Sequence, residues 1–406
     1  MNRSTMKRLT IPALITGLML PLAACGEGSG SGEGGDGTVV FGISAPLTGD
    51  AAGWGNAAKW LAEKAADEIN ETGGVETDDG NLEIEIAIQD NEYTAAGGAR
   101  AAQTLLNSNN VDMISFSVGT APVQALQSMT ERAEVPMMTS AWGKDLKGPD
   151  FPYTFTVINT PFEVLQPLAE YVLDAEGGFD TIALLGINDA TGIQSEQVSQ
   201  DVWAGLDVEV ISSDFYEHGT TEFAPIATKL LNGNPGAIDL TTVTPGPAGL
   251  LLRALADQGW DGPTLLSAGT GGQALVDAAA GAAEGVYMGL AADFSDSNAT
   301  EKQQELQAGL EDATGEELNG VTIGAYDGVI ALAEAIEEAG TIESNAVVEA
   351  LTTMTFESSW GPSAFGAEEV YGSKQQILTP MIVTQVRDNA IVEVERLIPA
   401  ELQAMQ

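Results

Sequence analysis

The chain has 406 residues, with 59 Asp or Glu against 15 Lys or Arg, so its formal net charge is −44. This shortage of basic residues argues against binding to nucleic acid or to an anionic membrane surface, because both require clustered Lys and Arg. A single cysteine excludes an intramolecular disulfide, and a single histidine excludes His-based metal sites and most His-dependent triads. A carboxylate-only metal or catalytic site stays open on composition alone. The 44 % of apolar residues can supply a core, so the charge does not indicate disorder.

The first 24 residues are typical of a secretion signal. Basic side chains within the first eight residues precede an apolar stretch from 9 to 24, which is too short to span a bilayer comfortably. The stretch ends in Leu-Ala-Ala-Cys-Gly, which resembles a bacterial lipobox. That resemblance implies cleavage before Cys25 and attachment of lipid to its sulfur. The alternative is an ordinary signal peptide with a chance cysteine.

A segment made only of Gly, Ser, Glu and Asp follows Cys25. It contains no apolar residue up to residue 37, and this composition predicts a flexible tether over 25–37. We therefore expect a soluble body from about Thr38 onward, held outside the cytoplasm by an N-terminal lipid.

The body alternates between short apolar runs and amphipathic stretches. A continuous apolar run at 39–43 predicts a buried strand, and alternation of apolar and polar residues at 82–88 predicts a strand with one solvent-exposed face. The strands expected after the first are 82–88, 111–116, 135–138, 181–187, 207–212, 237–243, 263–267, 285–290, 377–386 and 390–394. The helices expected are 55–71, 95–107, 123–132, 162–175, 193–204, 222–231, 247–258, 299–313, 321–338 and 344–351.

Regular strand–helix alternation with short loops predicts an α/β fold with parallel sheets covered on both faces. About 370 residues are too many for one doubly wound sheet and suit two. Ligands of such sheets bind beyond the carboxyl ends of the strands, so two sheets facing each other would form a cleft between their loops.

Several motifs occur in a telling order. Gly-Ile-Ser-Ala-Pro-Leu-Thr-Gly at 42–49 opens the body, and Asp-Glu-Ile-Asn-Glu-Thr-Gly-Gly-Val at 67–75 ends the first helix. Ala-Tyr-Asp-Gly-Val follows at 325–329. Together they resemble the leucine/isoleucine/valine-type solute-binding proteins of ABC transporters, over residues 38–394.

The resemblance implies two doubly wound lobes joined by three crossovers, a type I periplasmic binding protein. In such a protein a solute enters the cleft, the lobes close on it, and a membrane permease recognises the closed form. The crossovers are expected near Val157, Val286 and Trp360. The first lobe would then comprise 38–157 and 286–360, and the second 158–285 and 361–406.

The resemblance also suggests cleft residues. Trp54 matches the family's aromatic residue that covers the apolar part of the ligand; the alternative is a core Trp at the helix start. Thr120 begins a helix whose N–H groups could hold a carboxylate, or it is simply an N-cap. Thr244 follows another strand and suits a hydroxyl contact, or serves only as a cap. Ala141 and Trp142 lie where the family contacts the ligand's carboxylate and amino group.

The chain departs from the family at several points. Trp142 is bulky where the family has small residues, and Thr191 stands where many amino-acid binders have Tyr. Gly269 and Thr270 occupy the place of the acidic residue that pairs with the ligand's ammonium. An ammonium ion without an acceptor in a closed cleft is costly. We therefore hypothesise a small carboxylate, amide or aromatic acid held between the two tryptophans.

Two other residues bear on this site. Lys144 is a possible counter-ion for such a ligand, although a solvated loop residue is the alternative. His218 lies in a strand-to-helix loop with no His, Cys or clustered carboxylate as an evident partner, so we expect it on the surface.

The expected function is a lipid-anchored, monomeric solute receptor for ABC import, without cofactor or metal. A sensor of the same fold that signals to a membrane partner is the alternative. A hydrolase is disfavoured, because no Gly-x-Ser-x-Gly turn is present. The acidic body further suggests a protein exposed to a salty medium, since salt screens self-repulsion; an ordinary acidic secreted protein is the alternative.

Overall fold

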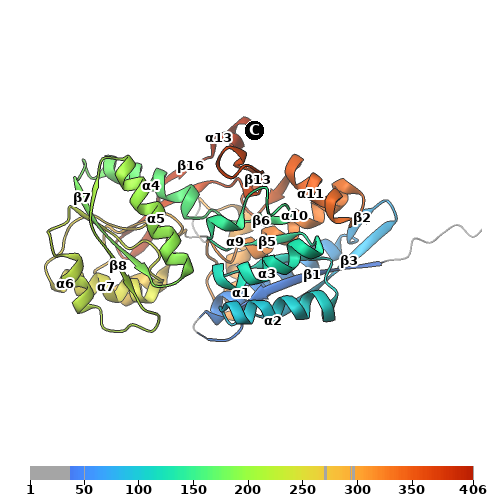
Figure 1. Ribbon diagram of the computed structural model, residues 1–406, viewed down its shortest axis with the longest axis horizontal. Helices are drawn as coiled ribbons and strands as arrows, with labels where there is room; N and C mark the ends of the chain where they lie inside the picture. Colours follow the sequence, from blue (N-terminus) through green and yellow to red (C-terminus); the bar gives the residue numbers. More distant parts are fainter. Residues whose placement is uncertain (1–36, 50, 269–271, 293, 295–297, 406) are drawn as a thin grey trace, which may run out of the picture. The chain divides into compact units, whose positions relative to one another are not determined.

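The computed structural model describes residues 37–49, 51–268, 272–292, 294 and 298–405 (Figure 1). The predicted signal peptide, Cys25, all but the last residue of the tether, Gly269 and Thr270 lie outside these ranges.

A nine-stranded sheet forms the first lobe, in the order β12-β13-β14-β6-β5-β4-β1-β3-β2. Its strands are β1 Gly37–Ala45, β2 Val75–Thr77, β3 Gly80–Asp90, β4 Met113–Ser117, β5 Met137–Thr139, β6 Thr154–Thr156, β12 Thr355–Ser358, β13 Gly361–Gly366 and β14 Gln376–Ile377. Its helical segments are α1 Ala52–Glu71, α2 Ala95–Thr104, η1 Leu105–Asn109, α3 Thr120–Ala133, η2 Lys144–Leu146, α9 Glu301–Thr314, α10 Gly324–Ala339, α11 Ser344–Thr353 and α12 Glu368–Tyr371. Neighbouring strands from β3 through β1, β4, β5 and β6 to β14 are parallel, and β2, β12 and β13 are antiparallel additions at the two edges.

A seven-stranded sheet forms the second lobe, in the order β16-β15-β11-β10-β9-β7-β8. Its strands are β7 Thr181–Ile187, β8 Glu209–Tyr216, β9 Ala237–Asp239, β10 Thr264–Leu266, β11 Tyr287–Met288, β15 Met381–Arg387 and β16 Ala390–Leu397. Its helices are α4 Pro161–Ala175, α5 Ala190–Gly205, α6 Ala224–Leu230, α7 Pro245–Asp257 and α8 Gln273–Ala279, while the C-terminal α13 Ala400–Met405 contacts β13. The strands from β8 to β11 are parallel, and β15 and β16 add an antiparallel edge.

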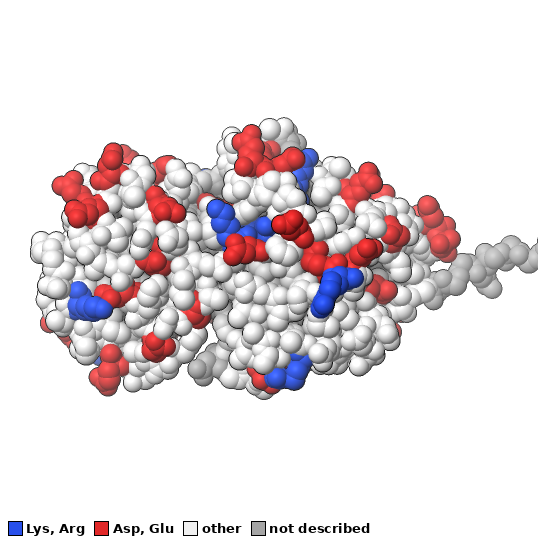
Figure 2. All heavy atoms as spheres, in the orientation of Figure 1, with Lys and Arg blue, Asp and Glu red and all other residues white. Residues whose placement is uncertain are grey.

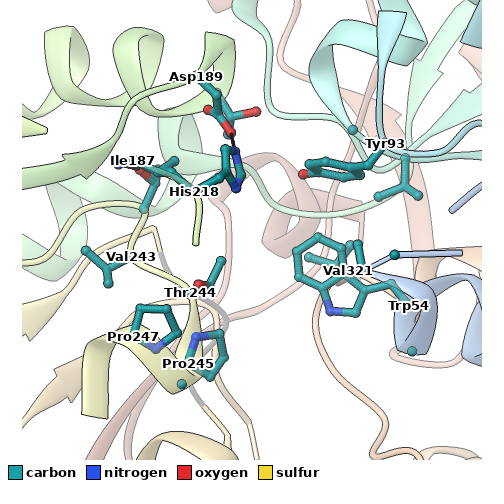
Figure 3. A pocket seen from close by; sticks show the side chains of 18 of the residues that line it. Trp54, Tyr93, Ile187, Asp189, His218, Val243, Thr244, Pro245, Pro247 and Val321 are labelled. Carbon is teal, nitrogen blue, oxygen red and sulfur yellow. Dashed lines mark hydrogen bonds and ion pairs between the residues drawn. The ribbon is translucent and has the colours of Figure 1, made fainter. Parts of the chain in front are cut away.

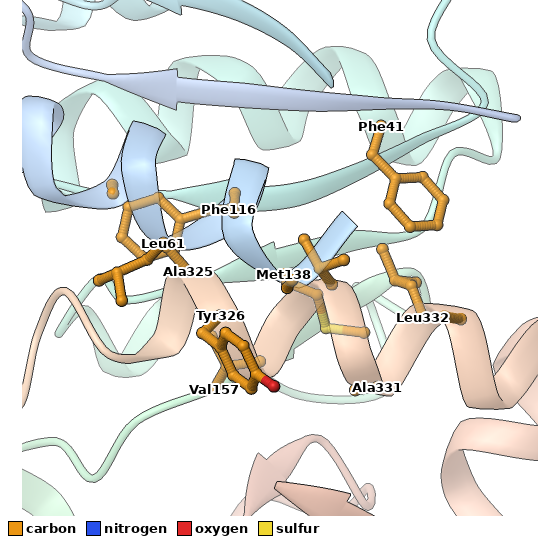
Figure 4. Packing of buried hydrophobic residues seen from close by; sticks show 14 of the residues in the cluster. Phe41, Leu61, Phe116, Met138, Val157, Ala325, Tyr326, Ala331 and Leu332 are labelled. Atoms are coloured by element: carbon orange, nitrogen blue, oxygen red, sulfur yellow. The ribbon is translucent and has the colours of Figure 1, made fainter. Parts of the chain in front are cut away.

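Both sheets are covered on both faces, which confirms the predicted α/β fold class. Buried side chains of α1, α9, α10 and α11 pack on one face of the first sheet, and those of α2 and α3 on the other. Figure 4 shows the first of these cores, where Phe41, Phe116 and Met138 from the strands meet Leu61 and Leu332 from the helices. In the second lobe, α4 and α5 cover one face, and α6, α7 and α8 the other.

Local sequence explains where the first helix stops. Gly74 has a φ of 79°, and a Cβ there would lie 2.3 Å from the carbonyl oxygen of Leu82. Only glycine fits this left-handed close approach, so the chain turns directly from α1 into the β2–β3 hairpin.

The chain passes between the sheets at three places. It leaves the first sheet after β6, returns after β11, and leaves again between Ile377 and Met381. The third passage was predicted near Trp360, but β13 and β14 beyond that residue still pair within the first sheet. The apolar run expected as one strand over 377–386 is in fact split, with β14 in one sheet and β15 in the other.

Acidic side chains are spread over the visible face of the molecule, and basic ones are few (Figure 2). None of the helices in the described part of the chain has both the length and the apolar character needed to cross a bilayer.

Candidate functional site

A cavity of about 770 Å³ lies where the carboxyl ends of strands from both sheets meet. Loops that follow β1, β3, β4 and β5 of the first sheet, and β7, β8 and β9 of the second, supply most of its wall. This is the edge at which parallel sheets bind ligands.

Six of the eight predicted ligand contacts line this one cavity: Trp54, Thr120, Ala141, Trp142, Thr191 and Thr244. The remaining two, Gly269 and Thr270, lie outside the described residues, and Ala274 just beyond them lines the cavity. The structure therefore brings together residues that are up to 190 positions apart in the chain, counting from Trp54 to Thr244.

Two aromatic rings form the wall of the first lobe. Trp54 and Tyr93 meet edge to face, with ring centroids 6.0 Å apart and an interplanar angle of 65°. Tyr93 reaches this place through an unusual backbone, because Glu92 and Tyr93 both have positive φ, at 51° and 53°. The Asn91 side chain accepts a bond from the Tyr93 amide at 2.9 Å and stabilises the turn. Strain of this kind persists where the surroundings hold it and is frequent at binding sites.

The wall of the second lobe carries a carboxylate–imidazole pair. Asp189 Oδ2 lies 3.1 Å from His218 Nε2, and Asp189 Oδ1 accepts a 2.8 Å bond from the Gly192 amide at the start of α5. Figure 3 shows these two side chains facing Tyr93 and Trp54 across the cavity. His218 is exposed, as expected from the sequence, but it has a carboxylate partner and lines the cavity, which corrects the expectation that it is an isolated surface residue.

The two lobes touch each other at one side of the cavity. The Thr191 hydroxyl donates to the Thr120 hydroxyl at 2.9 Å, and the Lys144 amide donates to Gln194 Oε1 at 3.1 Å. Thr120 is the first residue of α3 rather than its N-cap, since Gly119 occupies that position. The Thr120 hydroxyl is thus used between lobes, and the alternative of simple N-capping does not hold.

Trp142 touches the cores of both lobes. It packs against the cluster under α1 and α10 and also against the cluster under α4 and α5. Its Nε1 and the neighbouring Ser140 Oγ are buried without a hydrogen-bond partner among the described residues. An unpartnered buried donor costs about 1 to 3 kcal/mol, so this loop is poised for a further partner.

The charged side chains that line the cavity are mainly acidic. The carboxylates of Glu92, Asp189 and Glu316 line it, whereas no Lys or Arg does so among the described residues. Lys144, considered as a counter-ion, instead lies with its ammonium 5.8 Å from the ring centroid of Phe162. The described residues contain no group of three or more His, Cys, Asp or Glu that could hold a metal ion. Because Glu92, Asp189 and Glu316 supply carboxylates to the cavity, the absence of an acidic residue near position 269 is no argument against a ligand that carries an ammonium group.

Sequence reasoning missed Tyr93, Asp189 and His218. Asp189 follows the end of β7 by two residues, so the expectation that ligands bind beyond the carboxyl ends of parallel strands would have included it. Tyr93 likewise follows β3 by three residues. His218 could have been found by the same rule after β8, but its pairing with Asp189 joins two loops and has no local signal.

Comparison with known proteins settles the family. A model of periplasmic binding proteins matches residues 38–390. The chain belongs to the periplasmic binding protein family. This confirms the resemblance drawn from the sequence motifs.

Individual members of this family are similar over nearly the whole body. The leucine-, isoleucine-, valine-, threonine- and alanine-binding protein of Pseudomonas aeruginosa is 26 % identical over 338 residues, which cover 81 % of this chain and 86 % of that protein. A solute-binding protein of an ABC transporter from Rhodopseudomonas palustris, solved with 3,4-dihydroxybenzoic acid, has a TM-score of 0.75 at 20 % identity, covering 91 % and 99 % of the two chains. A branched-chain amino acid binding protein from Streptococcus pneumoniae, solved with isoleucine, has a TM-score of 0.72 at 21 % identity, covering 89 % and 99 %. The two solved structures establish the shared fold.

Proposed function

We propose that this protein captures a small polar solute in the cavity between its lobes and delivers it to an ABC importer in the membrane. The observation that carries the proposal is the cavity of about 770 Å³ in which six predicted contacts from both lobes converge. Its size suits a small molecule, since ligand sites measure about 300 to 1,000 Å³. Branched-chain amino acids, amides and small or aromatic carboxylates are the candidate solutes, and the leucine, isoleucine, valine and 3,4-dihydroxybenzoic acid named for the relatives fall in these classes.

Closure of the lobes is part of the proposal. The contact between Thr120 and Thr191 joins the lobes, and Trp142 packs on both cores. A solute that contacts both walls would favour the arrangement in which these contacts form, because it binds that arrangement better.

Attachment to the membrane by lipid on Cys25 completes the proposal. It places a monomeric receptor outside the cytoplasm, next to the permease that it serves. Membrane fractionation of cells that produce the wild type and Cys25→Ser tests it: the wild type should sediment with membranes and the variant should not. Equal sedimentation of both would refute the anchor.

A solute panel read by thermal shift tests the binding function. The panel contains branched-chain and aromatic amino acids, amides, urea, keto acids and aromatic acids. A true ligand at 100 times its Kd should add about 2.7 kcal/mol to the free energy of unfolding. Trp54→Ala should lose this response, while Trp260→Ala, outside the cavity, should keep it. No response to any compound would contradict solute binding in these classes.

A further inference from the structure

The three carboxylates of the cavity differ in how their charge is compensated. Glu92 lies 2.6 Å from the Arg100 guanidinium, and both side chains are about half exposed. Glu316 is packed beside Gly53 in the first turn of α1, where a Cβ would come within 2.7 Å of Glu316 Oε2. The N-terminus of a helix stabilises a negative charge. Asp189 faces neither a Lys nor an Arg among the described residues, and its side-chain partner there is the His218 imidazole.

Asp189 is held rigidly and still has acceptor capacity. One oxygen caps α5 through the Gly192 amide, and the other meets His218, which fixes the carboxylate plane. An ionised carboxylate offers about four acceptor positions. Two are occupied, and the side chain remains 25 % exposed, so a solute in the cavity can reach the others.

Aromatic rings stand opposite this carboxylate. In Figure 3 the hydroxyl end of Tyr93 is directed towards His218, and Trp54 lies beside it on the same wall. Burial and the negative charge of Asp189 raise the pKa of the Tyr93 hydroxyl, so it stays protonated at neutral pH. The faces of Trp and Tyr attract cations, and a carboxylate on the far side adds to that attraction.

We propose that Asp189 is a specificity-determining residue of the cavity, which selects solutes that carry a positively charged nitrogen and places it between the Asp189 carboxylate and the Trp54–Tyr93 wall. This inference rests on the proposed function and narrows it. A solute that is only an acid would bring a negative charge towards Asp189 without a Lys or Arg among the described lining residues to receive it. Its binding is therefore disfavoured relative to an amine of the same shape.

Two matched sets of compounds test the proposal by calorimetry on the full chain. One set is L-tyrosine, tyramine and 3-(4-hydroxyphenyl)propionate, and the other is L-leucine, 3-methylbutylamine and 4-methylpentanoate. Each set keeps one skeleton and presents amine and acid, amine alone, or acid alone. At least one amine-bearing compound should bind about tenfold or more tightly than the acid of its set, as expected for a charge-assisted hydrogen bond.

The variant Asp189→Asn separates the effect of the negative charge from the effect of the helix cap. Asn is as good an N-cap as Asp, so α5 keeps its cap while the charge is lost. The variant should weaken binding of the amine-bearing compounds about tenfold or more and reduce their preference over the acid. Asp201→Asn removes the same charge from an exposed position near the other end of α5 and should change nothing.

The outcomes separate the two proposals. If the acids bind as tightly as the amines, or if Asp189→Asn leaves the preference intact, solute binding stands and the role of Asp189 is refuted. If no compound binds the wild type, the binding function fails for these classes, and the inference fails with it.

Discussion

Lys147 Nζ lies 3.6 Å from Glu163 Oε1, although the Lys147 side chain has no exposure to solvent. Lys147 precedes β6 in the first lobe and Glu163 lies in the first turn of α4 in the second, so this ion pair bridges the first passage between the sheets. The ammonium also bonds Gln376 Oε1 at 2.6 Å and lies 4.0 Å from the ring centroid of Tyr371, whose hydroxyl donates to Glu163. Burial lowers the pKa of Lys147, and the charge of Glu163 opposes that shift.

Removal of one member of this pair should therefore be strongly destabilising. Lys147→Met leaves Glu163 without its cation, and we expect it to lower the free energy of unfolding by about 3 to 5 kcal/mol. The double variant Lys147→Met, Glu163→Gln should recover part of the loss, since Gln keeps the capping box of α4. Urea unfolding measures both.

The exposed pair between Lys59 and Glu63 provides the control. Its atoms are 3.8 Å apart and both side chains are about half exposed. Lys59→Met should change the free energy of unfolding by less than about 1 kcal/mol. A loss at Lys147 no larger than this would show that the buried pair is not structurally important.

The buried carboxyl of Asp327 predicts how the free energy of unfolding depends on pH. The carboxyl is fully buried and bonded to the Ser359 amide and hydroxyl at 2.6 and 2.8 Å, and burial raises its pKa to about 7. A raised native pKa means that the native state binds more protons than the unfolded state between about pH 4 and 7. Stability from this group is therefore present at low pH and lost as pH rises towards 7, by up to about 1.4 kcal/mol per pH unit.

Asp327→Asn removes this titration. The difference in unfolding free energy between the wild type and Asp327→Asn should shift against the wild type as pH rises from 4 to 8. Urea titrations at each pH measure it. A pH-independent difference for Asp327→Asn would contradict the assignment of a raised pKa.

The hydroxyl pair between the lobes predicts a coupled effect on binding. Thr120→Val and Thr191→Val each remove the 2.9 Å bond, and we expect two- to tenfold weaker binding of the tightest compound found, or about 0.5 to 1.5 kcal/mol. The double variant should be little worse than either single one. Additive losses in calorimetry would mean that the two hydroxyls act separately.

The acidic surface predicts a response to salt. With −44 formal charges and few basic partners, self-repulsion should lower stability at low ionic strength. The melting temperature should rise as NaCl increases from about 0.05 to 1 M, because the screening length falls to about 3 Å. Sorbitol at equal osmolality controls for solute exclusion. A melting temperature that is independent of NaCl would count against adaptation to a salty medium.

The sequence predicted the alternation of elements well where periodicity was strong, as in β1, β3 and α10. It missed β12 and β13, whose pairing depends on the Gly361 turn and on the two-residue strand β14, which is itself anchored to β6 far away in the chain. Positions after strand ends pointed to Thr120 and Thr244, and the family resemblance pointed to Trp54, Ala141, Trp142 and Thr191, all of which line the cavity. The Asp189–His218 pair joins two loops that only the folded sheet brings together, so no spacing in the sequence could predict it.

Closure of the lobes on a solute is the central claim, and the distance between α3 and α5 tests it directly. The chain has one cysteine, Cys25, so Cys25→Ser combined with Ser128→Cys and Gln197→Cys gives two defined label sites on exposed positions of the two lobes. Distances between spin labels on these two cysteines are then measured by double electron–electron resonance, with and without a saturating amount of a compound that calorimetry shows to bind. We expect a shorter and narrower distance distribution with the solute, and binding that leaves the distribution unchanged would contradict closure.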